Sequence, residues 1–349
     1  MNNSTLLVSD PKLSRPVNPC DVTVIVPAWN AEATLERAVD SALAQIDVRV
    51  EVIIIDDASS DNTLKIAKEL AAADPRVTVI AQQVNQGPAK ARNVGLAHAK
   101  GAFVTPLDSD DFMEAGRLAT LLALANKENW DFVADDLWQI DDGFPVNTTS
   151  RRRLFSDDVL GEVPINLADF VHGNMSKKHG GRREIGFLKP LMRRSFLDAQ
   201  DLRYREDMRL GEDYDFYARA LLRGGRFCLT DPAGYIAVVR AGSLSGHHDA
   251  AALRALVAAD DRLLQTSGLS LGDRHIIRAH RIETLKRWAW LDLIEAVRAR
   301  DIKRAIRSFA VPFPVAVSQL GKLIEQINQR GCARLRMLFG KRRFDRTKI

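Results

Sequence analysis

The sequence predicts an α/β protein with a mostly parallel sheet flanked by helices and a helical C-terminal extension. Short β-branched apolar segments recur through residues 22–107 without alternating polar residues, which is typical of strands buried on both faces. A stretch of helical length follows each segment, and parallel strands need such crossover connections. These patterns together indicate strands and helices alternating around one sheet.

The elements can be placed in order along the chain. The expected strands are 22–27, 50–56, 77–81 and 103–107, and the helices after them are expected at 31–45, 61–73, 88–99 and around 114–126. The pattern is irregular from about residue 130, until a helix that follows Gly211 and ends at Gly224 and Gly225. Residues 249–330 are helical in pattern, apart from turns near 268–273 and 312–314. We therefore expect an extended segment 1–20, an α/β domain 21–248 and a helical region 249–349 with a basic tail.

Composition excludes several classes of protein. With 349 residues, of which 46% are hydrophobic, the chain can bury enough apolar surface to order most of its length. The longest apolar run, 309–317, contains two prolines and is too short to cross a bilayer. The first residues lack a basic patch before an apolar core, so they do not resemble a secretory signal. Three scattered cysteines indicate neither a disulfide framework nor a zinc site. We expect a cytoplasmic protein.

The net charge of +5 is unevenly distributed. Residues 301–349 carry 12 Lys and Arg against 3 Asp and Glu, or +9, which leaves the rest of the chain at −4. Such a tail can bind nucleic acid, can bind anionic lipid, or can simply keep the protein soluble. Because the body has no basic patch interleaved with aromatic residues, we expect no nucleic-acid partner. Basic and apolar residues mix over 334–346, which suggests peripheral contact with the inner face of the membrane; a solvated helix or loose terminus is the alternative.

Three acids directly follow the fourth expected strand. Asp108, Asp110 and Asp111 would repel one another unless a cation lies between them. Carboxylate oxygens suit Mg²⁺ or Mn²⁺, which commonly bridge protein carboxylates to substrate phosphates. The alternative is a solvated turn with a helix N-cap. Position at the end of a parallel strand favours the ligand role, since such sheets bind ligands at this edge.

Two other clusters occupy neighbouring positions on the predicted edge. Asp56 and Asp57 end the second strand and suit hydrogen bonds from a base or ribose. For Ser60 or Asp61, which follow in the same run, the alternative is a role as a simple helix cap. The absence of a G-x-G-x-x-G sequence excludes the usual dinucleotide site. Lys90 and Arg92 fall in the first turns of a helix, where cations and free amides complement a diphosphate; a merely polar helix face is the alternative.

Two further groups lie later in the chain. Glu212 and Asp213 begin a helix, where acids often only oppose the helix dipole. A carboxylate beside another carboxylate also has the environment of a general base. His247 and His248 follow a Gly/Ser stretch and can ligate a metal, contact phosphate or simply be exposed.

Four motifs, in this order and spacing, resemble the inverting nucleotide-sugar glycosyltransferases of family 2. They are VTVIVPAWNAEATLERAVDSALAQ, VEVIIIDDASSDNT, NQGPAKARNVGLAHAKGAFVTPLDSDD and LGEDYDFYARALLRGG. The resemblance covers about residues 21–245 and implies the Rossmann-like GT-A fold, a UDP-sugar donor, a divalent metal and a catalytic aspartate. It departs from the common pattern at Ala58, where glycine is usual, and at Trp29, where tyrosine or phenylalanine is.

The resemblance assigns roles by position. It places Pro27, Trp29 and Asn30 beside the nucleoside, Asp57 with Asp56 where the base is read, and Arg92 with Asn93 near uridine. Asp108 and Asp110 match the D-x-D carboxylates that hold Mg²⁺ or Mn²⁺, Asp110 being the direct ligand. Asp213 matches the catalytic base of the family, and Glu212 orients it. Lys90, Arg92 or His247 adds positive charge at the departing UDP. Arg240, Ser243 and Ser245 match the R-x-x-S-x-S stretch that follows the catalytic core in this family.

The expected activity is transfer of a hexose, glucose in particular, from a UDP-sugar to a lipid-linked oligosaccharide. The sequence looks like the glucosyltransferases that build succinoglycan-type exopolysaccharide. The alternatives are a transferase for lipopolysaccharide or capsule, and a non-catalytic sugar- or nucleotide-binding module. A nucleotidyltransferase would need a glycine-rich nucleotide loop near the N-terminus, and a metal-dependent hydrolase would use more histidine than the seven in this chain.

Overall fold

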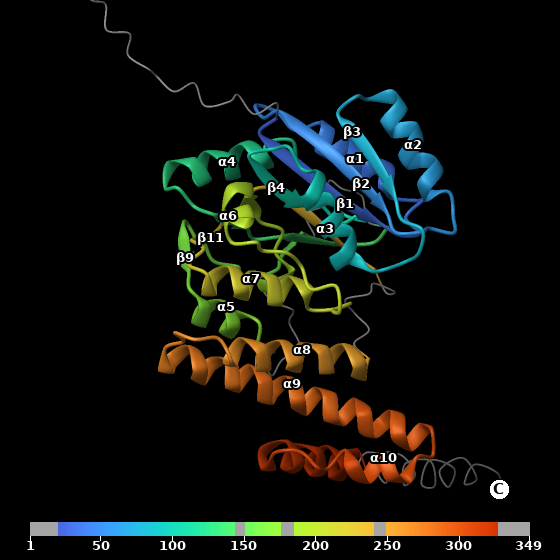
Figure 1. The fold of residues 1–349 in the computed structure, drawn as a ribbon, viewed down its shortest axis with the longest axis vertical. Helices are drawn as coiled ribbons and strands as arrows, with labels where there is room; N and C mark the ends of the chain where they lie inside the picture. Colours follow the sequence, from blue (N-terminus) through green and yellow to red (C-terminus); the bar gives the residue numbers. More distant parts are fainter. Residues whose placement is uncertain (1–19, 144–150, 176–184, 241–248, 327–349) are drawn as a thin grey trace, which may run out of the picture.

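The computed structural model describes residues 20–143, 151–175, 185–240 and 249–326. Its largest element is an eight-stranded sheet with the order β3-β2-β1-β4-β10-β6-β11-β9. In that order the strands are Val77–Ala81, Val50–Asp56, Val22–Ala28, Phe103–Pro106, Leu191–Arg193, Phe132–Asp135, Phe227–Thr230 and Val163–Ile165. The fold is therefore the predicted α/β class (Figure 1).

Strands β3, β2, β1 and β4 are all parallel to one another. Their bounds agree with the predicted strands to within one residue. The connecting helices are α1 (Leu35–Leu43), α2 (Thr63–Ala73), α3 (Pro88–His98) and, after β4, α4 (Arg117–Lys127). Gly95 brings α3 close to β1, because a Cβ at this position would collide with Ile25. This close packing sets the depth at which α3 side chains reach the sheet.

The irregular pattern after residue 130 has a structural cause. Strand β10 lies antiparallel between β4 and β6, although it comes much later in sequence than either. A second sheet has the order β5-β12-β7-β8, from strands Phe112–Met113, Tyr235–Val239, Trp138–Asp141 and Arg152–Arg153. Short strands from distant segments carry little periodicity, so sequence patterning does not reveal them.

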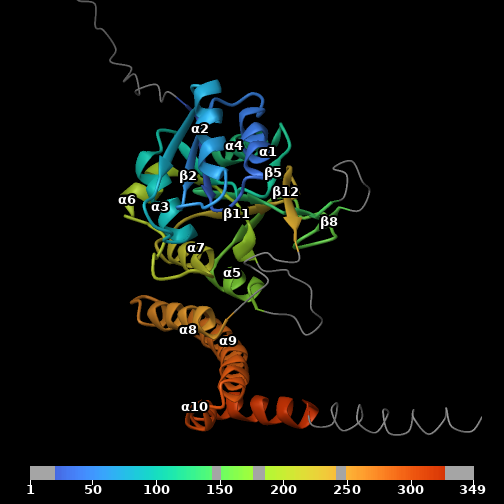
Figure 2. The same ribbon diagram turned by 90° about the vertical axis from the view of Figure 1, so that its right-hand side faces the viewer.

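The rest of the described chain is mainly helical. The helices are η1 (Ile185–Phe187), α5 (Leu167–Gly173), α6 (Arg194–Ala199), α7 (Glu212–Leu222), α8 (Ala250–Leu264), α9 (Leu271–Arg298), α10 (Ile302–Arg307) and a helix at 313–326. A break at 299–301 was not predicted; Arg300 has a positive φ there, and the Asp301 carboxylate caps α10 by accepting from the Arg304 amide at 2.9 Å. Figure 2 shows α9 running away from the sheets, with α10 at its far end.

The helical region shares its core with the α/β part. Leu263 of α8 and Ile277 of α9 belong to the same buried cluster as the strands of the large sheet. Within the described ranges, no helix combines the length and the apolarity that crossing a bilayer requires. Residues 1–19 and the basic residues of 334–346 lie outside the described residues, so the calls on them stay predictions.

Candidate active site

The three acids after β4 have different surroundings. Asp111 is buried: its Oδ2 accepts a hydrogen bond from the Tyr235 hydroxyl at 2.9 Å, and its Oδ1 accepts one from the Val238 amide at 2.8 Å. Burial raises the pKa of Asp111 well above its usual value, and the nearby Asp108 and Asp110 carboxylates add to this effect. Asp111 therefore joins the acidic turn to β12.

Asp108 is paired with two cations. Its Oδ1 lies 3.1 Å from Nη2 of Arg92, and its Oδ2 lies 3.0 Å from Nζ of Lys189. Burial opposes the charge of Asp108, but these two cations outweigh it and lower its pKa to about 2. Asp108 is thus ionised at neutral pH with both oxygens occupied.

Arg92 is the centre of the cluster. Its buried guanidinium projects from α3, with Nη1 2.7 Å from Oε1 of Glu212 and 3.4 Å from Oδ1 of Asp213. Burial opposes its charge, but Asp213, Asp108 and Glu212 together raise its pKa well above the ordinary value. One guanidinium therefore holds carboxylates from two distant segments, the end of β4 and the start of α7.

Helix α7 presents Glu212 and Asp213 in its first turn. It begins after Gly211, whose φ of +75° lies in the region that glycine favours. Burial raises the pKa of Glu212, and the adjacent Asp213 carboxylate contributes. Oδ2 of Asp213 lies 3.3 Å from Nζ of Lys189, and among the described residues its Oδ1 has no hydrogen-bond partner. Asp213 is thus held between two cations, because its Oδ1 faces Arg92 at 3.4 Å and its Oδ2 faces Lys189.

Lys189 is the site residue that sequence reasoning missed. It precedes β10, and the insertion of β10 beside β4 brings its ammonium group between Asp108 and Asp213. Burial opposes this charge, but the two carboxylates outweigh it and raise the pKa of Lys189. A signal was present: Lys189 is a lone charge within the otherwise apolar run 187–192, and a buried lysine needs a partner.

Asp56 and Asp57 differ in a way that the sequence did not reveal. The Asp57 carboxylate accepts from the Gln86 amide at 2.9 Å, the Gly87 amide at 2.8 Å and Nε2 of Gln82 at 2.8 Å. Asp56 accepts from the Ser59 amide at 3.3 Å through Oδ2, while its buried Oδ1 has no partner in the described structure. Asp57 thus fixes the loop before α3, and Asp56 keeps one buried carboxylate oxygen without a hydrogen-bond partner in the described structure.

The first-strand loop lies beside this pair. Oδ1 of Asn30 accepts from the Ser60 amide at 2.8 Å, so the loop is bound to the segment after β2. Trp29 is half exposed, with 49% of its surface accessible, and Pro27 pairs in register with Ile55. These residues lie at the same end of the sheet as Asp56, and their role beside a nucleoside stays a prediction.

Lys90 and Asn93 do not join the carboxylate cluster. Nζ of Lys90 lies 3.1 Å from Glu206, and Nδ2 of Asn93 donates to the same carboxylate at 3.0 Å. Asn93 also exchanges hydrogen bonds with the backbone of Tyr204. Both side chains therefore hold the segment before α7 in place. His247, His248, Ser243 and Ser245 lie outside the described residues.

Asp110 is the acid best suited to a metal. Burial raises its pKa, and the neighbouring Asp108 carboxylate raises it further. No side chain of the described residues donates a hydrogen bond to its carboxylate, whereas both oxygens of Asp108 are paired. In the same residues, no three His, Cys, Asp or Glu side chains converge as a ready-made metal site. The donor set fits a cation that takes one protein carboxylate and completes its shell with substrate phosphates and water.

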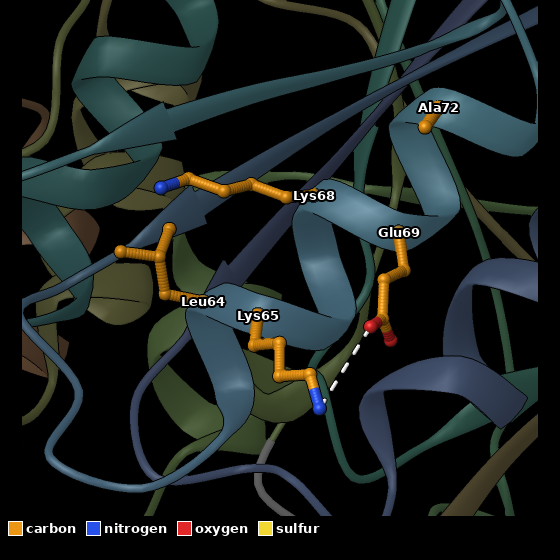
Figure 3. Close-up of a pocket in the computed structure, with 5 residues that line it drawn as sticks. All are labelled: Leu64, Lys65, Lys68, Glu69 and Ala72. Carbon is orange, nitrogen blue, oxygen red and sulfur yellow. Dashed lines mark ion pairs between the residues drawn. The ribbon is translucent and has the colours of Figure 1, made fainter.

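A surface hollow lies away from this cluster. Figure 3 shows it along α2, lined by Leu64, Lys65, Lys68, Glu69 and Ala72. Lys65 and Glu69 form an ion pair at 3.9 Å across its edge. Because all five residues come from one helix and none belongs to the acidic cluster, we assign no catalytic role to it.

Comparison with known proteins identifies the family. A family model described as "Glycosyl transferase family 2" matches residues 23–196. The succinoglycan biosynthesis protein ExoU of Rhizobium meliloti (strain 1021) is 40% identical over 301 residues, which cover 86% of this chain and 85% of that protein. The chain belongs to glycosyltransferase family 2. ExoO of the same organism is 35% identical over 320 residues, covering 91% of this chain and 87% of ExoO.

Solved structures agree on the fold of this family 2 enzyme. TarS residues 1–349 of S. aureus, in complex with UDP-GlcNAc, gives a TM-score of 0.59 at 20% identity, over 82% of this chain and 90% of that one. The mannosyltransferase PcManGT of Pyrobaculum calidifontis, in complex with GDP-Man and Mn²⁺, gives a TM-score of 0.52 at 18% identity. The match covers 88% of this chain and 87% of PcManGT. The fold is GT-A, as the motifs predicted.

Proposed function

We propose that the enzyme transfers a hexose, glucose in particular, from a UDP-sugar to a hydroxyl of a lipid-linked oligosaccharide, with inversion at the anomeric carbon. The pathway is succinoglycan-type exopolysaccharide biosynthesis. The observation that carries the proposal is the meeting of Asp108 and Asp213 on either side of Lys189, because it joins the acidic turn to the expected base. Identity to ExoU and ExoO over most of the chain supports the pathway.

Asp213 acts as the general base. Its carboxylate accepts the proton of the attacking hydroxyl while the hydroxyl oxygen bonds to the anomeric carbon. On the opposite face of the sugar, the bond from that carbon to the diphosphate oxygen breaks, and UDP leaves with the electron pair. Glu212 is 2.7 Å from Arg92, and Arg92 and Lys189 hold Asp213 in place. Orientation of this kind supplies much of the rate in a bimolecular transfer.

The nucleoside and diphosphate bind along the neighbouring strand ends. Asp56 offers its unpartnered Oδ1 to a base N–H, and Trp29 with Asn30 covers the nucleoside. Asp57 acts indirectly, since its carboxylate holds the adjoining loop. Asp110, with Asp108 beside it, would hold Mg²⁺ or Mn²⁺, and the bound cation would offset the charge that develops on the departing UDP.

A lipid-linked acceptor places the reaction at the inner face of the cell membrane. The basic tail favours this location because cationic residues are attracted to anionic lipid. Removing residues 331–349 should weaken binding to anionic vesicles. Unchanged binding would count against a role of the tail.

The test of the proposed function is nucleotide release. The purified chain is mixed with UDP-glucose, other UDP-hexoses and GDP-mannose in turn, each with Mn²⁺, Mg²⁺ or EDTA, and with or without membrane lipid extract. We expect metal-dependent release of UDP that rises on addition of the extract. Preference for GDP-mannose would overturn the donor assignment, and release unaffected by any extract would overturn the acceptor class.

A further inference from the structure

Exposed apolar side chains gather at one end of the molecule. In the described residues, seven of the twelve large apolar side chains that are exposed lie between 297 and 324. We call these seven the distal patch: Val297, Ile302, Ile306, Phe313, Val317, Leu320 and Ile324. Figure 2 shows α10 and the helix at 313–326 at the end of α9 farthest from the large sheet. Such a concentration marks an interaction surface rather than scattered exposure.

The helix at 313–326 has two apolar faces. One face packs inward: Val315 is fully buried with Leu285 and Ala289, and Nε2 of Gln319 donates to the Ala289 carbonyl at 2.9 Å. The other face carries Phe313, Val317, Leu320 and Ile324, at spacings that align them along one side of a helix. The inward face is apolar because it packs on α9. No described residue covers the outward face.

Cations accompany the apolar residues at this end. Arg298, Arg300, Lys303 and Arg307 are exposed beside Val297, Ile302 and Ile306. Residues 297–326 contain six Lys and Arg against two Asp and Glu. The patch therefore joins apolar surface to a strong local excess of positive charge.

We propose that the distal patch docks on an anionic phospholipid bilayer. Exposed apolar side chains enter the boundary between headgroups and acyl chains, and the adjacent cations meet the lipid phosphates. A second copy of the chain fits the charge less well, because it would bring two basic ends together. This surface is separate from the carboxylate cluster and uses residues other than the tail at 334–346.

The experiment is vesicle flotation with the full chain and no sugar donor, so that its result does not depend on the proposed reaction. Vesicles contain either phosphatidylcholine alone or equal parts of phosphatidylcholine and phosphatidylglycerol. The test variant combines Leu320→Gln and Ile324→Gln, at side chains that are 52% and 59% exposed. We expect wild type to float with the anionic vesicles, less so with added salt, and the variant to lose at least about fivefold of its binding.

A matched control combines Ile46→Gln and Val159→Gln, which are 55% and 83% exposed and lie outside the patch. It should float like wild type, and circular dichroism should give all three proteins the same helix content. Undiminished flotation of the test variant would overturn the proposal. So would a wild-type dimer that the test variant converts to a monomer with unchanged flotation, since the patch would then bind a second copy.

Discussion

Two cations divide the acids of the site into paired and unpaired groups. Asp108, Glu212 and Asp213 share Arg92, and two of them also share Lys189. Asp110 stands outside this network, with its pKa raised by burial and by Asp108. A carboxylate without a fixed partner is the one able to take up a cation.

Replacing Asp213 by asparagine tests the base. Asn keeps the shape of the side chain but cannot accept the proton, so turnover should fall by about 10²–10⁴-fold. Calorimetric affinity for UDP should stay near the wild-type value. Asp207→Asn is the control, since this exposed acid lies in the segment before α7 and outside the cluster. Near-normal turnover of Asp213→Asn would remove Asp213 from the mechanism.

Replacing Asp110 by alanine tests the metal. Wild type should bind UDP more tightly with Mn²⁺ than with EDTA. Asp110→Ala should abolish that difference, because we propose the Asp110 carboxylate as the protein ligand of the cation. Isothermal titration calorimetry in both conditions measures this. Metal-enhanced binding that persists in the variant would contradict the assignment.

Asp56 and Asp57 should respond differently to the same substitution. Asp57→Asn sets an amide donor against two backbone N–H groups, and we expect it to lower the free energy of unfolding by about 1–3 kcal/mol. Asp56→Asn should weaken UDP binding with a smaller loss of stability. Urea unfolding and calorimetry on both variants separate the two effects, and equal behaviour would refute the distinction.

The site was predictable where chemistry follows directly from sequence position. The meeting of Asp108 and Asp213 could be expected because one follows a regular strand and the other begins a helix; their chemical roles stay predictions. The distinct roles of Asp56 and Asp57 could not be expected, because neighbouring residues point to different partners that only the folded loop supplies. Lys189 reaches the cluster through the pairing of β10 with β4, a contact between residues far apart in sequence.

At the scale of elements, the first turn of helix α7 is held by contacts with α8 and α9. The Tyr214 hydroxyl donates to Oδ1 of Asp260 at 2.8 Å, and Nδ1 of His280 lies 2.8 Å from Oδ2 of the same carboxylate. Tyr214 also stacks on His280, with ring centroids 4.5 Å apart. Since Tyr214 directly follows Asp213, α8 and α9 help to hold the turn that carries the proposed base.

Replacing Asp260 by alanine leaves both buried partners without an acceptor. We expect the free energy of unfolding to drop by about 2–4 kcal/mol. Asp261→Ala, which removes a partly exposed pair with Arg281, should cost about 1 kcal/mol or less. Chemical denaturation of the two variants provides the comparison, and equal losses would show that the buried network contributes no more than the surface pair.

Strands with a continuous apolar run were predicted well. Val24 and Ile54 lie in strands whose residues are almost all buried, and each such run is short and is followed by a stretch of helical length. Strand β5, from Phe112–Met113, is only two residues long, and its partner β12 lies more than 100 residues later. Nothing local in the sequence distinguishes such a strand from a loop.

At the scale of the whole molecule, the predicted boundary at 248 divides residues that share one core. A chain ending at residue 248 would expose the surfaces that Leu263 and Ile277 cover. We expect it to unfold at a lower temperature than the full chain and to bind a hydrophobic dye. A chain ending at residue 330 is the control, because it keeps every described helix. Full stability of the shorter chain would show that 21–248 folds independently.

The late arrival of β10 has a consequence for synthesis on the ribosome. Strands β3, β2, β1 and β4 can pair as soon as the first 106 residues have left the exit tunnel. Strand β6 is made soon afterwards, but both of its neighbours, β10 and β11, are still untranslated. Its open edges must wait for residues 191–193 and 227–230, and during that wait they are the part of the nascent chain most exposed to misassembly or capture by chaperones.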